Sequence, residues 1–493
     1  MEGQQGVIGI RRETKTYWER RVAITPQDVK RLINEGIRVL VQPSTNRCFS
    51  DIEFAEAGAE LTEDLTPAKL IIGVKEIPTD ELIPNRTYML FSHTLKGQPY
   101  NMPLLDAFLE KQIRLIDYEC IKSLEPPHNR LVAFGTFAGS AGMVDFLQGL
   151  GKYLLMKHIS TPFLLQGFAY MYRSLADIYE SIEHIGEIIS HDGFHPSVVP
   201  MIFGVTGNGR CASGALNILT KLPHEFIEPE QLENFTPNEQ SRFKIYIVRF
   251  PIRYIYRRFS DDGFDRAEYQ ENPEMYKSVF KKYAAKLSCL VHAIYWDSKY
   301  PKMLTVDDIK TLNGRLLGIC DISCDIKGGI QICRKFTSPE EPFYLYSSED
   351  DRIHYLSSLH INNSILYHSM DFLSSELPRD ASEHFSKLLF DYIEELAWDD
   401  ANKSFEEINL NPEIKNAIMT CHGQLTPGFR YITDIRRNVV TPVRRNDTID
   451  KIADVVRENP HLASDLENTM NKQALTKESE RAVITIREII KRK

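Results

Sequence analysis

The first part of the chain alternates short apolar runs with an amphipathic stretch. Residues 6–10 (GVIGI) and 37–41 are apolar runs of strand length. Between them, Thr25-Pro26 has the residue types of a helix N-cap and first turn, and Gly36 those of a helix end. Helical spacing relates the apolar residues Val29, Leu32 and Ile33. The same alternation predicts further strands at 70–74, 88–91 and 113–116, and a helix at 102–109. Alternation of this kind favours a mainly parallel, doubly wound α/β sheet.

A second α/β unit follows a long predicted helix. The helix covers about 139–156 and begins with the small residues of AGSAGM. After it, residues 198–205 form an apolar run that leads directly into Gly207 and Gly209, with a helix over 215–219. Later strand candidates lie at 225–228, 245–248, 290–296 and 316–322. These elements predict a second doubly wound domain that ends near Gly329.

The last third of the chain has two possible assignments. Residues 330–431 mix strand and helix patterns, and 382–398 is a strong amphipathic helix. This region is either a third domain or a completion of the first. The tail from about 441 is polar and charged, and 478–493 has the pattern of a terminal helix.

Composition narrows the function classes. The net charge is −9 and the basic residues are spread along the chain, which argues against nucleic acid as a partner. The eight cysteines form no CxxC pair, and no second pair or nearby histidine completes a zinc site around Cys320 and Cys324, so we expect reduced thiols and no metal site. No apolar run is long enough for a membrane span, and the N-terminus lacks a signal or transit pattern. We therefore expect a cytoplasmic protein, with a mitochondrial location left open.

The turn Gly207-Asn208-Gly209 has the features of a dinucleotide site. The first glycine permits a tight turn, and the second lets the backbone approach a pyrophosphate at a helix N-terminus. The spacing is not GxGxxG, because the third glycine is delayed to Gly214. Glu228 lies about 20 residues further on, at a strand end, where an acid can bind ribose hydroxyls. The alternative is a purely structural turn.

Ionisable residues follow two strands of the first unit. Lys75 and Glu76 come after one apolar run, and His93 comes after another, with Lys96 and Gln98 close behind. The carboxyl ends of parallel strands face the ligand crevice, so Lys75 and His93 could form an acid/base pair. The alternative is a solvated lysine and a structural histidine.

Other charged groups are ambiguous on their own. Arg20 and Arg21 precede a helix N-cap, where an arginine can bind a substrate carboxylate, although they could equally be a surface pair. Glu119 and Arg130 flank short apolar stretches. The residues Asp321, Ser323 and Asp325 end a strand of the second unit.

Long motifs carry a family resemblance. In order, they are IGIRRETKTYWERRVAITP, IIGVKEIP, FSHTLKGQPYNMPLLDAFLEKQIRLIDYE, RLVAFGTFAGSAGMVDFLQGLG and AIYW. These segments resemble lysine–2-oxoglutarate reductase, the L-lysine-forming saccharopine dehydrogenase, which is the first half of aminoadipic semialdehyde synthase. The wider family includes alanine dehydrogenase and the nucleotide-binding part of transhydrogenase. The resemblance covers about residues 7–435.

The resemblance implies two Rossmann-like domains with a cleft between them, the first of them discontinuous. It assigns 1–138 and 331–440 to the substrate domain, 139–330 to the NAD(P)-binding domain and 441–493 to a charged tail. The implied reaction condenses lysine with 2-oxoglutarate and reduces the imine with NAD(P)H. The implied partners are lysine, 2-oxoglutarate and saccharopine, with no nucleic acid, membrane or metal. A homo-oligomer and a separate glutamate-forming saccharopine dehydrogenase remain open.

Residue roles follow from the same resemblance. Lys75 matches a general base and His93 a general acid. The substrate-binding positions are Arg21, Glu76, Gln98, Glu119 and Phe134. The cofactor-binding positions are Arg130, Gly207, Gly209, Arg210, Cys211, Ser213, Gly214, Glu228, Tyr295, Asp321, Ile322 and Ser323.

Several positions depart from the family pattern. Phe372 and Ser374 stand where relatives have a small or polar residue and a proline, and HINNSIL lacks expected glycines. Glu228 favours a free ribose, yet the resemblance favours NADP(H) over NAD(H). The arginines Arg249, Arg253, Arg257 and Arg258 are candidates for a 2′-phosphate contact or for surface charge. The rival functions are a related amino-acid or opine dehydrogenase, such as alanine dehydrogenase, and a non-catalytic nucleotide-binding homologue.

Overall fold

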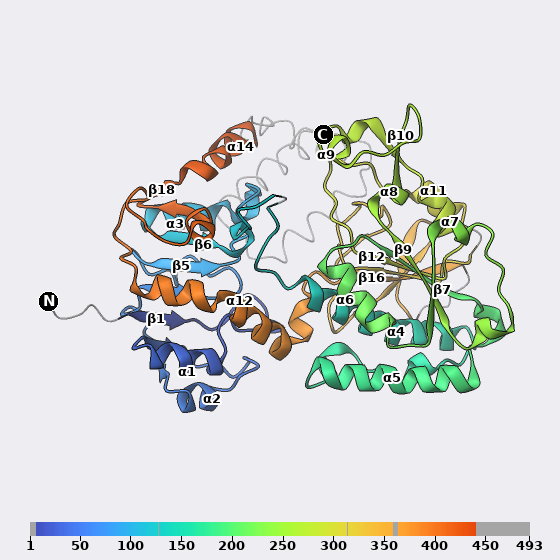
Figure 1. The fold of residues 1–493 in the computed structure, drawn as a ribbon, viewed down its shortest axis with the longest axis horizontal. Coiled ribbons are helices and arrows are strands. Elements are labelled where there is room, and N and C mark those ends of the chain that lie inside the picture. The colour runs from blue at the N-terminus through green and yellow to red at the C-terminus, as the bar shows by residue number, and fades with distance from the viewer. Residues whose placement is uncertain (1–5, 127, 313, 358–362, 440–493) are drawn as a thin grey trace, which may run out of the picture. The chain divides into compact units, whose positions relative to one another are not determined.

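The computed structural model describes residues 6–126, 128–312, 314–357 and 363–439 (Figure 1). The chain divides into two compact units. The first joins Met1–Ser92 to Asp106–Gln424, and the second joins His93–Leu105 to Leu425–Lys493. The first unit contains two large sheets, so the expected α/β class with two Rossmann-like domains is confirmed.

The first sheet has the strand order of a doubly wound fold. Its parallel strands run β3-β2-β1-β4-β5-β6, and β17 pairs antiparallel with β6. The strands are β1 (Val7–Ile10), β2 (Arg38–Val41), β3 (Glu60–Leu61), β4 (Leu70–Ile72), β5 (Thr87–Leu90), β6 (Arg114–Asp117) and β17 (Ile418–Cys421). β18 (Gln424–Leu425) follows where the first unit ends. The strand order reverses between β1 and β4, which is where such folds place a ligand.

Helices accompany this sheet. They are α1 (Pro26–Asn34), α2 (Asp51–Glu56), α3 (Met102–Glu110), α12 (Pro378–Trp398) and α13 (Pro412–Lys415). Among them, α1, α3 and α12 correspond to helices that the periodicity predicted. Thr25 stands at the N-cap of α1 and Pro26 is its first residue, as expected. α12 packs against α1 and β1, and Thr25 N–H donates to the Ser386 hydroxyl at 3.1 Å.

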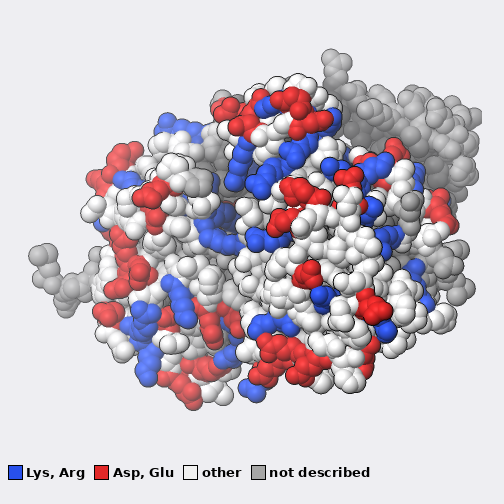
Figure 2. All heavy atoms as spheres, turned by 45° about the vertical axis from the view of Figure 1, so that its right-hand side comes forward, with Lys and Arg blue, Asp and Glu red and all other residues white. Residues whose placement is uncertain are grey.

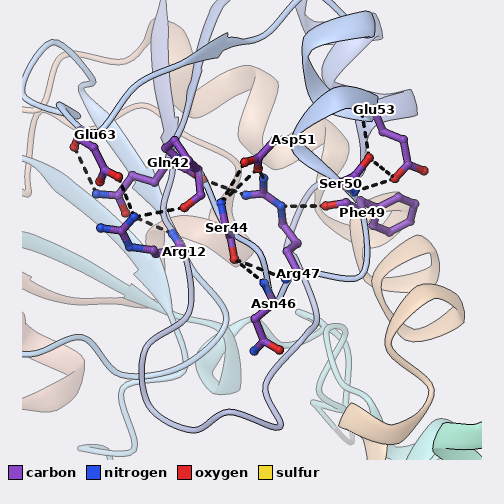
Figure 3. A network of polar contacts seen from close by, with 11 residues as sticks. Arg12, Gln42, Ser44, Asn46, Arg47, Phe49, Ser50, Asp51, Glu53 and Glu63 are labelled. Atoms are coloured by element: carbon purple, nitrogen blue, oxygen red, sulfur yellow. Dashed lines mark hydrogen bonds and ion pairs between the residues drawn. The ribbon is translucent and has the colours of Figure 1, made fainter.

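The loop between β2 and α2 is held by the buried side chain of Arg47 (Figure 3). Its guanidinium donates to the carbonyls of Gln42 and Phe49 at 3.2 and 3.1 Å and pairs with Asp51 at 2.5 Å. Ser50 then caps α2 through a reciprocal pair of hydrogen bonds with Glu53. These hydrogen bonds hold the backbone of the loop in place beside the first sheet.

The strands of the second sheet do not follow sequence order, since β16 lies between β13 and β14 and β9 lies next to β7. Its order is β15-β14-β16-β13-β12-β7-β9-β8, so β9 lies between β7 and β8. All neighbours are parallel except β14 and β15. The strands are β7 (Met201–Thr206), β8 (His224–Ile227), β9 (Ile245–Phe250), β12 (Cys289–His292), β13 (Gly318–Asp321), β14 (Tyr344–Ser347), β15 (Arg352–His354) and β16 (Ser364–His368).

Two glycines let the helices over this sheet approach closely. The main helices are α4 (Gly135–Met156), α5 (Leu175–Asp192), α6 (Arg210–Leu219), α7 (Pro229–Leu232) and α11 (Val306–Lys310). A Cβ on Gly139 would lie 2.0 Å from the Cys211 carbonyl oxygen, and one on Gly214 would lie 2.0 Å from that of Thr136. The crossing of α4 and α6 therefore requires glycine at both positions.

An insertion follows β9. It consists of α8 (Ile252–Ile255), β10 (Tyr256–Arg258), α9 (Arg266–Glu271), β11 (Tyr276–Ser278) and α10 (Lys281–Ala284). β10 and β11 pair antiparallel, and the buried rings of Tyr256, Tyr269 and Tyr276 pack between them and the sheet. The hairpin therefore shares a hydrophobic core with the second sheet.

The expected domain boundary at 330 needs correction. Strands β14 to β16 lie after it, yet they extend the second sheet. Only from α12 onward does the chain rejoin the first sheet. The segment 331–440 therefore contributes to both sheets, because β16 finds its parallel partner in β13.

The second unit is small in its described part. It contains η1 (Pro99–Asn101), η9 (Pro427–Phe429) and α14 (Tyr431–Val439). The Tyr431 hydroxyl donates to the Leu95 carbonyl at 3.0 Å. The expected polar tail and its helix at 478–493 lie outside the described residues.

Candidate active site

Lys75 lies at the point where the strand order of the first sheet reverses. It follows β4, and its backbone is fixed by Glu13, which follows the neighbouring β1. The Glu13 carboxylate accepts from the N–H groups of Val74 and Lys75 at 2.7 and 2.9 Å. Arg11 lies 3.6 Å from the same carboxylate. Two adjacent strand ends thus hold the lysine in place.

The environment of Lys75 favours its neutral amine. Burial lowers its pKa, and the positive charge of Arg21 lowers it further. The negative charges of Glu19 and Glu76 act in the opposite direction without cancelling the effect. An amine with a lowered pKa is neutral over a wider pH range than a free lysine and is therefore better suited to accept a proton.

Arg21 is buried and fully engaged by its neighbours. Its Nε and Nη2 donate to the two oxygens of Glu19 at 2.7 and 2.5 Å. Its Nη1 donates to the Ser374 hydroxyl at 2.7 Å, and its guanidinium lies 4.2 Å from the Phe134 ring centre. Ser374 therefore has a partner in the structure, although the sequence marked it only as a departure from the family.

The remaining predicted substrate residues of the first unit form ion pairs or aromatic contacts. Glu76 pairs with Lys15 at 2.5 Å, and Glu119 pairs with Arg130 at 3.0 Å. The Phe134 ring stacks on Phe385 with centroids 4.3 Å apart. These residues and Arg21 line up around the carboxyl ends of β4 and β6.

Sequence reasoning missed the two acids that organise this site. Glu13 and Glu19 stand beside pairs of arginines in a charged segment without clear periodicity, so no pattern distinguished them. The one available signal is the placement of Glu13 three residues after an apolar strand.

His93 and Gln98 belong to the second unit. His93 has a positive φ of 50°, and its carbonyl accepts from the Asn101 amide at 3.4 Å. Gln98 is the N-cap of η1. The pairing of His93 with Lys75 stays a prediction.

The glycine turn lies between β7 and α6, where the sequence predicted it. Gly207 has a φ of +86°, and a Cβ there would lie 2.9 Å from the Ala293 carbonyl oxygen. A Cβ on Gly209 would meet nothing within 4 Å. α6 begins at Arg210, so its first N–H groups face the turn. This open cradle at a helix N-terminus fits a dinucleotide pyrophosphate.

A cavity of about 610 Å³ adjoins this turn. Its wall includes Tyr295, which is 65% exposed and could stack on a ring. The other lining segments are 207–209, 251–253, 264–266, 269–270, 293–294 and Tyr300. The size and the aromatic lining suit a nucleotide.

The structure assigns other contacts to several predicted cofactor residues. Asp321 is buried and accepts from Tyr367 at 2.6 Å, with His292 at 2.8 Å. Ser323 donates to the Ile294 carbonyl at 2.8 Å, and Ile322 is buried. Asp321 and Ser323 thus shape the strand ends beside the cavity.

Of the predicted cofactor residues in α6, some pack against neighbouring residues and others are exposed. Arg210 donates to the Arg130 carbonyl at 2.7 Å, and Ser213 is exposed. Burial raises the pKa of the Cys211 thiol, which keeps it protonated. Gly214 is a packing residue of the α4 crossing. Glu228 ends the edge strand β8 and does not belong to the described lining of the cavity.

Acidic and basic side chains alternate over the face shown in Figure 2. Within the described ranges, no cluster of three or more His, Cys, Asp or Glu residues has metal-ligand geometry. Among the same residues, no helix has the length and apolarity needed to cross a membrane.

Known proteins similar to this chain include enzymes of lysine metabolism. Residues 9–141 match the family described as alanine dehydrogenase/PNT, N-terminal domain. The mitochondrial alpha-aminoadipic semialdehyde synthase of Bos taurus is 36% identical over 452 residues, covering 88% of this chain and 48% of the relative. The Arabidopsis thaliana synthase is 35% identical over 466 residues, covering 90% of this chain and 43% of the relative. This chain therefore spans about half the length of these relatives.

Shorter relatives and a solved structure agree with these matches. The saccharopine dehydrogenase [NAD(+), L-lysine-forming] of Emericella nidulans is 26% identical over 393 residues, covering 78% of this chain and 90% of that protein. An L-alanine dehydrogenase structure superposes with a TM-score of 0.56 at 15% identity, covering 88% of this chain and all of the other, which supports the fold. The resemblance predicted from the sequence is thus confirmed: over most of its length the chain is a homologue of the alpha-aminoadipic semialdehyde synthases, and its residues 9–141 match the alanine dehydrogenase/PNT N-terminal domain family.

Proposed function

We propose that this protein catalyses the reductive condensation of L-lysine with 2-oxoglutarate to saccharopine, the first step of lysine degradation, with a nicotinamide cofactor as reductant. One observation carries the proposal: Lys75, with a lowered pKa, lies at the reversal point of the first sheet beside Arg21. The name of the Emericella nidulans relative supplies saccharopine and L-lysine, and the family resemblance of the sequence motifs implies 2-oxoglutarate.

Lys75 is the proposed general base. Its neutral amine takes a proton from the ammonium group of the incoming lysine, which frees that nitrogen to attack the keto carbon of 2-oxoglutarate. His93 is the proposed general acid, which donates the proton that leaves with water when the imine forms. Because Glu13 fixes the backbone of Lys75, the base is pre-positioned for this transfer.

Carboxylate binding is the proposed role of Arg21. A substrate carboxylate can take over hydrogen bonds that Glu19 and Ser374 accept in this structure. Glu76, Glu119, Gln98 and Phe134 complete the proposed substrate site. The bound cofactor supplies a hydride, and the protein positions the substrate against it.

The proposed cofactor is NADP(H) in preference to NAD(H). The turn 207–209 and the N-terminus of α6 provide the pyrophosphate site. Support for the preference comes from Glu228, since this acid follows the edge strand β8 and does not line the cavity. The first sheet is then the substrate domain and the second sheet the nucleotide domain.

Absorbance at 340 nm tests the function. NADPH and then NADH are mixed with the full chain, lysine and 2-oxoglutarate, and each substrate is omitted in turn. Oxidation that requires both substrates, with saccharopine as the product, is the expected result. Oxidation with ammonia and a different 2-oxo acid would instead identify a related amino-acid dehydrogenase. Cofactor binding without any oxidation would favour a non-catalytic homologue.

A further inference from the structure

β7 lies between β12 and β9, and on the side where the chain continues after the glycine turn its neighbour is β9, which changes which residues meet the adenosine. Six residues of β9 pair in parallel with β7, from Met201↔Ile245 to Thr206↔Phe250. β8 pairs only with the far side of β9. In dinucleotide-binding sheets, the residues that follow the strand next to the glycine-turn strand face the adenosine ribose. In this chain those residues are 251–253, and Glu228 is one strand further away.

The lining of the cavity agrees with this strand order. Its wall contains Gly207 and Gly209 together with Pro251, Ile252 and Arg253. The inserted hairpin adds a second arginine, Arg266, to the wall. The pyrophosphate turn and two arginines therefore border one space of about 610 Å³.

Both arginines are available to bind a negatively charged ligand. Arg253 and Arg266 are exposed, and neither forms an ion pair with any residue in the described part of the chain. The Arg253 guanidinium lies 5.0 Å from the Tyr254 ring centre, and its hydrogen bond to the Tyr254 hydroxyl raises its pKa. The Tyr254 hydroxyl in turn donates to the Glu230 carboxylate at 2.5 Å, and this bond fixes the ring that contacts Arg253.

Other charges of the insertion are already engaged. Arg258 pairs with Asp261 at 2.8 Å and with Glu268 at 2.6 Å, which closes the hairpin. Asp265, the acid on the cavity wall, is the N-cap of α9 and accepts from the Glu268 N–H at 2.8 Å. These acids of the hairpin thus have partners within the hairpin, while Arg266 lines the cavity.

We infer that Arg253, assisted by Arg266, recognises the 2′-phosphate of NADP(H) and sets the cofactor preference of the protein. The inference rests on the proposed function for the nicotinamide cofactor and adds the residues that select it. A phosphomonoester carries close to two negative charges near neutral pH and accepts charge-assisted hydrogen bonds from guanidinium groups. An acid inside this space would repel that group, and Glu228, whose charge raises the pKa of Arg253, does not line the cavity.

The test measures binding and needs no turnover. Isothermal titration calorimetry on the full chain compares 2′,5′-ADP, which carries a 2′-phosphate and a 5′-phosphate, with 5′-AMP, which lacks only the 2′-phosphate. We expect the wild type to bind 2′,5′-ADP at least about tenfold more tightly. Arg253→Ala should remove most of this preference and leave the affinity for 5′-AMP unchanged. Arg266→Ala should reduce the preference by a smaller factor.

Arg257→Ala is the matched control, because Arg257 belongs to the same hairpin but not to the described cavity wall. It should keep the wild-type preference. Equal binding of the two nucleotides by the wild type would overturn the inference, as would an Arg253→Ala protein that still prefers 2′,5′-ADP. If the preference depends on Arg253 but lysine and 2-oxoglutarate give no NADPH oxidation, the inference holds and the proposed function fails.

Discussion

Lys75 owes its proposed reactivity to neighbours that are distant in sequence. Glu13 fixes its backbone, while burial and Arg21 lower its pKa. The sequence predicted Lys75 and Arg21 as candidates, because charged residues at strand ends and before helix caps stand out from the apolar pattern. Glu13 and Glu19 could not be predicted this way, since their role depends on how β1 and β4 pair and on where Arg21 folds.

Removing the Lys75 amine should abolish most of the activity. Lys75→Met keeps the length and apolar stem of the side chain, so we expect kcat/KM to fall about 10²–10⁴-fold, the usual contribution of a general base. Steady-state oxidation of NADPH measures this. The 2′,5′-ADP affinity should stay at the wild-type value. A variant that retains activity within a few fold would exclude Lys75 as the base.

The charge of Glu19 should tune the pH profile. Its carboxylate raises the pKa of Lys75, so Glu19→Gln lowers that pKa further. Because the base must be neutral, kcat/KM falls on the acid side of this pKa, and the acid limb should move to lower pH in the variant. A pH profile of kcat/KM from 5 to 10 checks the direction. An unchanged or upward-shifted limb would contradict the proposed coupling.

At the scale of elements, periodicity predicted most of the parallel strands and the helices α1, α3, α4, α6 and α12, but not α2, α5 or the elements of the insertion after β9. The predicted helix 382–398 is α12 (Pro378–Trp398), and the predicted run 245–248 is β9 (Ile245–Phe250). Their positions in the sheets do not follow, because an apolar run carries no information about which strand it will join. For this reason the insertion of β9 beside β7 and the place of β14 to β16 appear only in the structure.

Alanine substitutions at Gly214 and Gly209 should distinguish a role in helix packing from a role in cofactor binding. Gly214→Ala puts a Cβ 2.0 Å from the Thr136 carbonyl oxygen, so we expect a loss of about 1–3 kcal/mol in the free energy of unfolding. Gly209→Ala meets nothing within 4 Å and should unfold like the wild type. It should nevertheless bind 2′,5′-ADP more weakly, because the methyl group enters the phosphate cradle. Urea unfolding and calorimetry measure the two effects, and a stable Gly214→Ala would show that α4 and α6 can separate.

At the scale of the whole molecule, a buried carboxyl pair should make stability depend on pH. Asp145 of α4 and Glu376 of η8 (Leu373–Glu376) are buried together, and burial raises the pKa of both. The folded protein therefore holds a proton to higher pH than the unfolded chain, whose carboxyls titrate at about pH 4. The free energy of unfolding should fall as the pH rises from about 4 through these raised values.

Glu376→Gln removes one of these titrations. At pH 8 the variant should be more stable than the wild type by about 1–3 kcal/mol, since one pKa unit corresponds to about 1.4 kcal/mol. At pH 4 the two proteins should be equal. Urea unfolding at both pH values measures the difference, with the exposed Glu110→Gln as control. A parallel pH dependence of Glu376→Gln and the wild type would refute the role of the pair.

The return of the chain to its first sheet also has a consequence for synthesis. β1 to β6 leave the ribosome early, but α12 and β17, which complete that sheet, come only after the entire second sheet. At about 5–20 residues per second, the interval is on the order of ten to fifty seconds. During it, the apolar surface that α12 covers on α1 and β1 is open to other chains. Nascent chains of this protein should therefore depend on chaperones until residue Trp398 has emerged.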